Sequence, residues 1–468
     1  MPAEMLANSG EPRRGFWTNR SVLALSQGAD PVDVIVAKAR SLTFEAFESG
    51  WSGPPYDPFA LAELMKIEVL PSEDVADART VPAVGGKLRI EFNPNRSPGR
   101  INYSIAHELG HALFPDCAEG VRNRTKHTGA TRDEWQLEML CNIAAAEILM
   151  PVGSLRSEDL EPSVDRLLQM RKDYAVSSEA ILLRIIRLTT KPCLAILARR
   201  DPDSPAGRYR ADYAVGSRAW SSPVANGFAL PLDTVLSECT AIGFTAKATE
   251  NWFRTAADWK IEALGIPPYP GHVYPRVIGI AKPVSDRETE VAKITYLKGD
   301  ATAPRGSDYR ILAQVVNDKS IVWGAGFARA VRKKWPKVQG EFAQWVVSGR
   351  GEFKLGNTHI SAVDDSIALA SLVAQHGFGP SATPRIRYSA LEMCLDRLGD
   401  YAVSRHADVH MPRIGSGEAG GSWEIVSEII EETLCRRGVR VTVYDLPNAK
   451  GKQAPKQLAL SIGPEITA

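Results

Sequence analysis

The sequence has no long apolar run and no secretory leader pattern. No stretch reaches the roughly 20 consecutive apolar residues that a membrane-crossing helix needs. The start of the chain, Met1 to Asn8, lacks a basic segment followed by an apolar one. We therefore expect neither a membrane span nor secretion, and we predict a cytoplasmic protein.

The chain also lacks a net charge of either sign. Its 56 lysines and arginines nearly balance 55 aspartates and glutamates, for a formal net charge of +1. Because no basic field surrounds such a chain, the composition does not indicate direct nucleic-acid binding.

Cysteine is sparse, and the cysteines are scattered. The six are Cys117, Cys141, Cys193, Cys239, Cys394 and Cys435. No Cys-x-x-Cys pair occurs, which favours reduced thiols over a disulfide framework. The 468 residues are otherwise ordinary for a globular chain of two to four domains, with 44% hydrophobic and 24% charged residues.

One short motif, His107-Glu108-Leu-Gly-His111, predicts a metal centre. Residues four apart on a helix share a face, so His107 and His111 can both turn an imidazole nitrogen toward one zinc ion. Glu108 then lies beside the metal, where it can act as general base toward an activated water. The pattern is typical of zinc peptidases.

A catalytic zinc usually has three protein ligands, so a third is expected downstream. The position six residues after His111, where an extended zinc-peptidase motif carries a histidine, holds Cys117. His127 lies in a polar, basic stretch. Glu134 and Glu138 begin a helical run over 134–149, and their spacing alone does not separate them.

The stretch from 104 to 151 resembles the ImmA/IrrE family of zinc metallopeptidases, and the likeness extends over about residues 25 to 190. Its second motif is Glu138-Met-Leu-Cys-Asn142-Ile-Ala144-Ala-Ala-Glu-Ile-Leu-Met-Pro151. The resemblance implies that Glu138 is the third zinc ligand. Ala144 departs from the family, which usually has Phe there. A zincin-like fold also implies that the strand Arg89 to Asn93 borders the cleft and pairs with extended substrate.

A second chemical centre is expected in the C-terminal third. Alternating strands and helices there predict an α/β/α sandwich. Two glycine-rich loops, Gly324-Ala-Gly326 and Gly415-Ser-Gly417, follow strands and precede helices. Such loops bring backbone N–H groups and the positive end of a helix to a phosphate. The pattern predicts a nucleotide site.

Residues 290 to 447 resemble the macro domain, a module that binds ADP-ribose. The resemblance implies that Asp300 holds the adenine amino group and that Asn317 lies on the ribose side. It implies two diphosphate loops, made by Gly324, Gly326 and Phe327 and by Gly415, Ser416, Gly417 and Glu418. The branch that removes ADP-ribose uses a catalytic Lys and Asp, but Gln375 and Ala419 stand at these positions. This departure favours binding or sensing over hydrolysis.

The fold class expected is multidomain, mixed α+β and α/β. The predicted parts are a flexible tail (1–22), a zincin-like peptidase domain (23–190), a small α+β middle domain (191–285), a macro domain (290–447) and a tail (448–468).

Together these features predict a zinc endopeptidase that cleaves a protein partner, such as a helix-turn-helix repressor, under control of ADP-ribose or a related nucleotide. Stress response and phage defence are the settings that the family resemblance implies. The alternative is an ADP-ribose reader or glycohydrolase in which the macro domain carries the main function.

Overall fold

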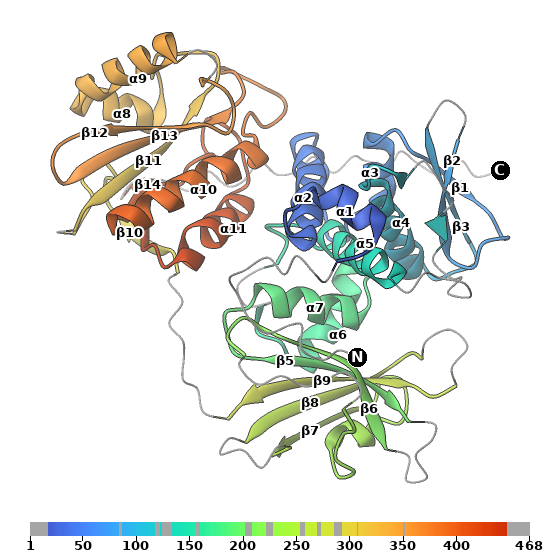
Figure 1. Cartoon of the computed structure of the whole chain (residues 1–468). Coiled ribbons are helices and arrows are strands. Elements are labelled where there is room, and N and C mark those ends of the chain that lie inside the picture. The colour runs from blue at the N-terminus through green and yellow to red at the C-terminus, as the bar shows by residue number, and fades with distance from the viewer. Residues whose placement is uncertain are drawn as a thin grey trace, which may run out of the picture. The chain divides into compact units, whose positions relative to one another are not determined.

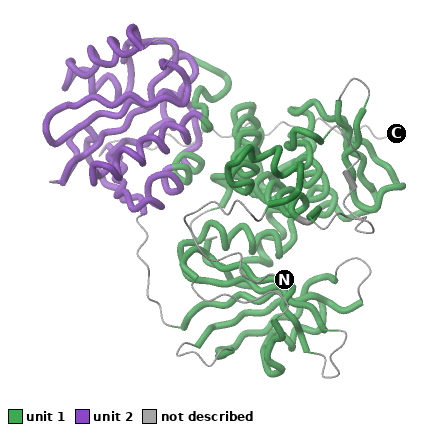
Figure 2. Tube along the Cα trace, in the orientation of Figure 1, with its two compact units in different colours: residues 1–291, 380–389, 424–429 green, residues 292–379, 390–423, 430–468 purple. Residues whose placement is uncertain are grey.

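The structure is a computed structural model, and it divides into two compact units. It describes residues 17–83, 87–117, 122–123, 133–155, 160–201, 208–220, 228–252, 258–268, 273–284, 293–306, 308–349 and 352–446. Unit 1 comprises 1–291, 380–389 and 424–429, and unit 2 comprises 292–379, 390–423 and 430–468 (Figure 2). Each unit is described by itself.

Unit 1 begins with a helical layer beside a four-stranded sheet (Figure 1). The helices are α1 (Arg20–Ser26), α2 (Pro31–Glu48), α3 (Pro58–Leu64), α4 (Pro98–Ala112) and α5 (Glu134–Leu149). The strands, in the sheet order β1-β3-β2-β4, are β1 (Glu68–Pro71), β3 (Leu88–Phe92), β2 (Ala78–Pro82) and β4 (Arg122–Asn123).

The position of β3 corrects one expectation. The strand forms as predicted, but it pairs in parallel with β1 and antiparallel with β2. Because both of its edges are hydrogen-bonded within the sheet, β3 has no free edge for a substrate strand. Both β2 and β3 pack against α4, and β2 pairs on its other side with β4.

Helices α4 and α5 pack closely because small residues meet where they touch. A Cβ added at Gly110 of α4 would lie 3.0 Å from the Cys141 carbonyl oxygen and 3.2 Å from Cβ of Ala144 on α5. Only glycine fits this approach without a shift of backbone. The small residue at 144, where the family usually has Phe, therefore sits at the contact between the two helices.

The rest of unit 1 is a second sheet beneath two helices. Helices α6 (Val164–Tyr174) and α7 (Ser178–Leu188) precede it, and Ser177 caps α7 by accepting a bond from the Ala180 N–H. Its strands are antiparallel, in the order β6 (Tyr209–Gly216), β5 (Leu194–Arg200), β9 (Arg276–Pro283), β8 (Trp259–Ile266) and β7 (Thr245–Glu250). Buried side chains of α7 and of this sheet share one core with helices α1 to α5.

Unit 2 is built on a six-stranded sheet that is parallel except at one edge. The order is β10 (Thr295–Lys298), β15 (Val441–Asp445), β14 (Asp408–Pro412), β11 (Arg310–Asn317), β13 (Ile367–Gln375) and β12 (Thr358–Ala362). The helices of this part of the chain are α8 (Gly326–Lys334), α9 (Pro336–Ser348), α10 (Tyr388–Arg405) and α11 (Trp423–Thr433). Helices α8 and α9 lie on one face of the sheet and α10 on the other (Figure 1).

The mixed α+β and α/β fold class is confirmed. Helix α5 spans the predicted run 134–149, whereas α1 begins at Arg20, inside the segment expected to be a tail. Strands β2, β4, β7, β8 and β12 and helix α9 were not predicted. The domain boundaries stay predictions. Among the described residues no helix is both long and apolar enough to cross a membrane.

Candidate active site and nucleotide-binding edge

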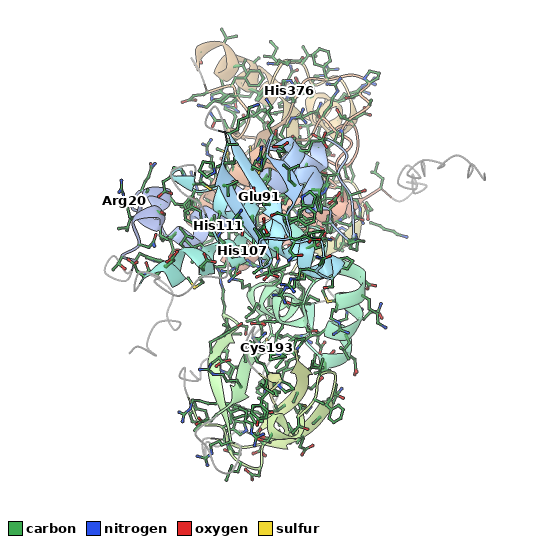
Figure 3. The ribbon with its side chains drawn as sticks, turned by 90° about the vertical axis from the view of Figure 1, so that its right-hand side faces the viewer. Arg20, Glu91, His107, His111, Cys193 and His376 are labelled. Carbon is green, nitrogen blue, oxygen red and sulfur yellow. The ribbon has the colours of Figure 1, made fainter. Side chains whose placement is uncertain are left out.

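The two histidines of the motif lie side by side on α4 (Figure 3). Both side chains are buried, each with 1% of its surface exposed, and their ring centroids are 4.9 Å apart. The helical spacing therefore produces the paired imidazoles that the sequence predicted.

Glu138 on α5 faces both rings. Its Oε2 lies 3.1 Å from Nε2 of His107, and its Oε1 lies 3.5 Å from Nε2 of His111. The two Nε2 atoms and one carboxylate thus converge on one point between α4 and α5. Three such groups suit a metal ion that keeps an open coordination position.

The other nitrogen of each ring is held by α5. Asn142 Oδ1 lies 2.9 Å from Nδ1 of His107, and the Tyr103 hydroxyl donates to the same oxygen at 2.8 Å. The Sγ of Cys141 lies 3.2 Å from Nδ1 of His111. When Nδ1 of His107 donates its proton to the amide oxygen, Nε2 carries the lone pair. The ring is then in the tautomer that can bind a metal through Nε2.

Cys141 is an alternative third ligand, because His107, His111 and Cys141 have ligand atoms within 4.8 Å of one another. The contact geometry argues against it. The sulfur lies at Nδ1 of His111, and Nδ1 and Nε2 of one imidazole point in different directions. A metal bound by the two Nε2 atoms beside Glu138 would have Cys141 behind the ring. We therefore favour Glu138.

Glu108 is fully buried between α4 and β2. The Thr80 hydroxyl donates to its Oε2 at 2.9 Å, while Oε1 has no hydrogen-bond partner among the described residues. Burial raises the pKa of the Glu108 carboxyl from its ordinary 4.5 to about 7, although His107 and the Thr80 hydrogen bond oppose the rise. A buried, unpaired carboxylate oxygen beside two imidazoles fits a metal centre with its water.

Two other third-ligand candidates do not join this cluster. Cys117 is buried beyond the end of α4, and Glu134 begins α5 one turn before Glu138. The third, His127, lies outside the described residues. Thr80 was missed by sequence reasoning. The sequence signal there is weak, since only the β-branched pair Thr80-Val81 could have indicated a strand. The site residues as a set stay predictions.

In unit 2 the predicted nucleotide contacts gather at one edge of the sheet. Asp300 follows β10 and Asn317 ends β11, and parallel strands bring their carboxyl ends to the same edge. The exposed Asp300 accepts a bond from the Thr302 N–H at 2.8 Å. Asn317 Oδ1 accepts from the N–H groups of Lys319 and Ser320 at 2.9 and 2.7 Å. These bonds form turns that orient both side chains.

The two glycine loops meet at this edge. Gly326 has φ +53°, and a Cβ added there would lie 3.9 Å from Cγ of Glu418. Gly415 has φ +72°, and its carbonyl accepts from the Gly421 N–H at 2.9 Å. Gly324 and Gly417 have open space around their Cα atoms, and Phe327 is half-buried in the first turn of α8.

The two positions at which the ADP-ribose-removing branch has its catalytic Lys and Asp are occupied by other residues. Gln375 at the end of β13 donates to the Gly377 carbonyl at 2.8 Å, and Ala419 is buried. The next residue, His376, contacts Asp318 at the end of β11, with 2.9 Å between Nδ1 and Oδ2.

Comparisons with known proteins found relatives for two parts of the chain. Residues 64–185 match the model of the Peptidase_M78 family, the IrrE N-terminal-like domain. The radiation response metalloprotease IrrE of Deinococcus radiodurans is 30% identical over 107 residues, which cover 22% of this chain and 33% of that protein.

A C-terminal portion is similar to macrodomain proteins. The human ADP-ribose glycohydrolase OARD1 is 28% identical over 162 residues, covering 34% of this chain and 97% of that protein. The solved structure of a macrodomain protein from Streptomyces coelicolor is 38% identical over 33% of this chain and 99% of its own, with a TM-score of 0.30.

The chain spans only 19% and 16% of the length of two vertebrate relatives, the chromodomain-helicase-DNA-binding proteins 1-like of Mus musculus and Danio rerio. Over residues 64–185 the protein thus matches the IrrE N-terminal-like domain of the Peptidase_M78 family, and in its C-terminal part it is similar to macrodomain proteins.

Proposed function

We propose that this protein is a zinc-dependent endopeptidase that cleaves a protein partner, such as a helix-turn-helix repressor, and that ADP-ribose or a related nucleotide bound at unit 2 regulates the cleavage. One observation carries the peptidase part. The Nε2 atoms of His107 and His111 both face Glu138, with the buried Glu108 carboxyl on the same helix as the histidines.

The chain's own residues divide the work of peptide hydrolysis. His107, His111 and Glu138 would hold the metal, which when bound supplies a Lewis acid and lowers the pKa of a water to about 7. Glu108 accepts the proton of the attacking water and passes it to the amine that leaves. Thr80 fixes one oxygen of this carboxylate, so that Oε1 is the oxygen left to exchange the proton.

The test is cleavage of a candidate partner by the full-length chain. The helix-turn-helix regulator encoded nearest to this gene is incubated with the protein and zinc, with and without ADP-ribose. Glu108→Gln serves as the inactive control and Glu134→Gln as the matched control. Cleavage that requires Glu108 and changes with ADP-ribose supports the proposal. If cleavage proceeds at the same rate with and without ADP-ribose, the nucleotide does not regulate the peptidase.

A second candidate function is supported by the similarity to OARD1, of which the chain covers 97%. In this alternative the C-terminal portion reads or removes ADP-ribose, and the peptidase only releases or limits that activity. Asp300→Ala, which removes the predicted adenine contact, separates the two. If Glu108→Gln leaves the cellular phenotype intact while Asp300→Ala abolishes it, the main function lies in unit 2.

A further inference from the structure

An aspartate–histidine pair lies on the strand edge that carries the predicted nucleotide contacts. Asp318 follows β11 and His376 follows β13, its neighbour in the sheet. Nδ1 of His376 lies 2.9 Å from Oδ2 of Asp318. The histidine side chain is 49% exposed, whereas the aspartate side chain is only 9% exposed. The pair therefore has an acid that is mostly covered and an accessible base (Figure 3 labels the histidine).

The aspartate is fixed in its charged form. Its Oδ1 accepts the Gly377 N–H at 2.9 Å, and Lys319 Nζ lies 3.5 Å from Oδ2. Burial alone would raise the pKa of Asp318, but the hydrogen bonds from Gly377 and His376 outweigh it and lower the pKa below the ordinary value. A carboxylate held in this way orients the imidazole and leaves Nε2 as the basic nitrogen.

The order of the strands places this pair at a defined end of the edge. From β10 to β13 the sheet runs β10-β15-β14-β11-β13. The predicted adenine contact Asp300 follows β10, and the predicted diphosphate loops follow β14 and β11. Four strand spacings of about 4.8 Å separate β10 from β13, or about 19 Å. A nucleotide laid along this edge, adenine at β10 and diphosphate at β14 and β11, extends its distal ribose toward β13.

We propose that His376, oriented by Asp318, is the general base of an ADP-ribosyl hydrolase site at the ends of β11 and β13, acting on ADP-ribose esterified to an acidic side chain. The proposal rests on ADP-ribose binding at unit 2. The aspartate–histidine pair supplies a base at an edge where Gln375 and Ala419 stand in place of the catalytic Lys and Asp of the branch that removes ADP-ribose.

The reaction balances with water alone. Nε2 of His376 takes one proton from a water molecule, whose oxygen forms a bond to the anomeric carbon of the distal ribose. The bond from this carbon to the ester oxygen breaks, and its electron pair leaves on the side-chain carboxylate. The products are free ADP-ribose and the restored acidic residue, and the imidazolium returns its proton to solvent.

The experiment uses the full-length chain with a peptide mono-ADP-ribosylated on glutamate. Release of ADP-ribose is measured for the wild type, His376→Ala and Asp318→Asn, and calorimetry measures ADP-ribose binding by each. His406→Gln, at an exposed histidine beyond α10, is the matched control. General-base catalysis contributes about 100-fold or more. We expect His376→Ala to lose at least about 100-fold in kcat while ADP-ribose affinity changes less than about 3-fold.

Two further readouts separate a base from a structural contact. Added imidazole is expected to restore part of the activity of His376→Ala, and Asp318→Asn is expected to lower kcat with KM unchanged. If the wild type binds ADP-ribose but releases none from the modified peptide, His376 is not a general base and unit 2 is a reader. Equal rates in the wild type and His376→Ala also overturn the proposed base. A wild type that does not bind ADP-ribose removes the proposed function of unit 2 itself.

Discussion

The amide oxygen of Asn142 lies 2.9 Å from Nδ1 of His107, on the far side of the ring from Glu138. The same helix, α5, therefore presents a carboxylate to one nitrogen of His107 and an amide to the other. Because the amide oxygen also accepts the Tyr103 hydroxyl, its orientation does not depend on the histidine alone. The ring is positioned before any metal is bound.

Removing this support should weaken metal binding. Asn142→Ala is expected to lower zinc affinity about 10- to 100-fold, the usual cost of losing an outer partner of a histidine ligand. Tyr103→Phe, which removes only the second bond to the amide, should have a smaller effect. Competition with a chromophoric chelator measures both. An unchanged affinity in Asn142→Ala would show that the contact does not position the ligand.

Glu138 and Cys141 should differ as metal partners. Glu138→Ala is expected to reduce affinity more than Asn142→Ala does, because it removes a ligand rather than a support. Cys141→Ala should cost about 10-fold, since its sulfur contacts Nδ1 of His111. Cobalt substitution gives a direct readout. A sulfur-to-cobalt charge-transfer band in the wild type that vanishes in Cys141→Ala would assign the third ligand to the cysteine instead.

Thr80 should affect turnover and not metal loading. Thr80→Val keeps the shape of the side chain and removes the hydroxyl that donates to Glu108 Oε2. A hydrogen bond to a charged group is worth about 1.5–3 kcal/mol, so kcat for peptide cleavage should fall about 10-fold or more. Zinc affinity, measured on the same sample, should stay within about 2-fold. A parallel loss of both would indicate that β2 has been disturbed.

The buried Glu108 should make the metal-free protein sensitive to pH. Its folded-state pKa of about 7 exceeds the ordinary 4.5, so the unfolded chain releases this proton at lower pH than the folded one. The free energy of unfolding of the wild type therefore falls relative to that of Glu108→Gln as pH rises from 4.5 to 7. The total loss is about 3 kcal/mol. In excess chelator, the Tm of Glu108→Gln should exceed that of the wild type at pH 8 and nearly equal it at pH 4.5. Equal Tm values at both pH values would contradict the shift.

Local signals in the sequence predicted the local parts of the structure. The spacing of His107 and His111 predicted their common face, and the helical run over 134–149 predicted α5 at its observed bounds. These features depend on residues within one or two turns of each other, so the chain order is enough to find them.

The contacts missed from the sequence join distant segments. Thr80 meets Glu108 because β2 packs beside α4, 28 residues along the chain. The place of β3 inside its sheet depends on β1 and β2 together, and a single strand pattern does not specify its neighbours. His376 and Asp318 are 58 residues apart and meet only because β13 pairs with β11.

The pairing of β4 with β2 has a kinetic consequence for substrate capture. Residues Arg122–Asn123, from the connection between the two histidine- and glutamate-bearing helices, already pair with β2 at Arg79 and Thr80. A substrate segment that pairs with β2 on this side has to displace β4 first. The rate of cleavage of a substrate bound in this way would saturate with substrate concentration at the rate at which β4 separates from β2.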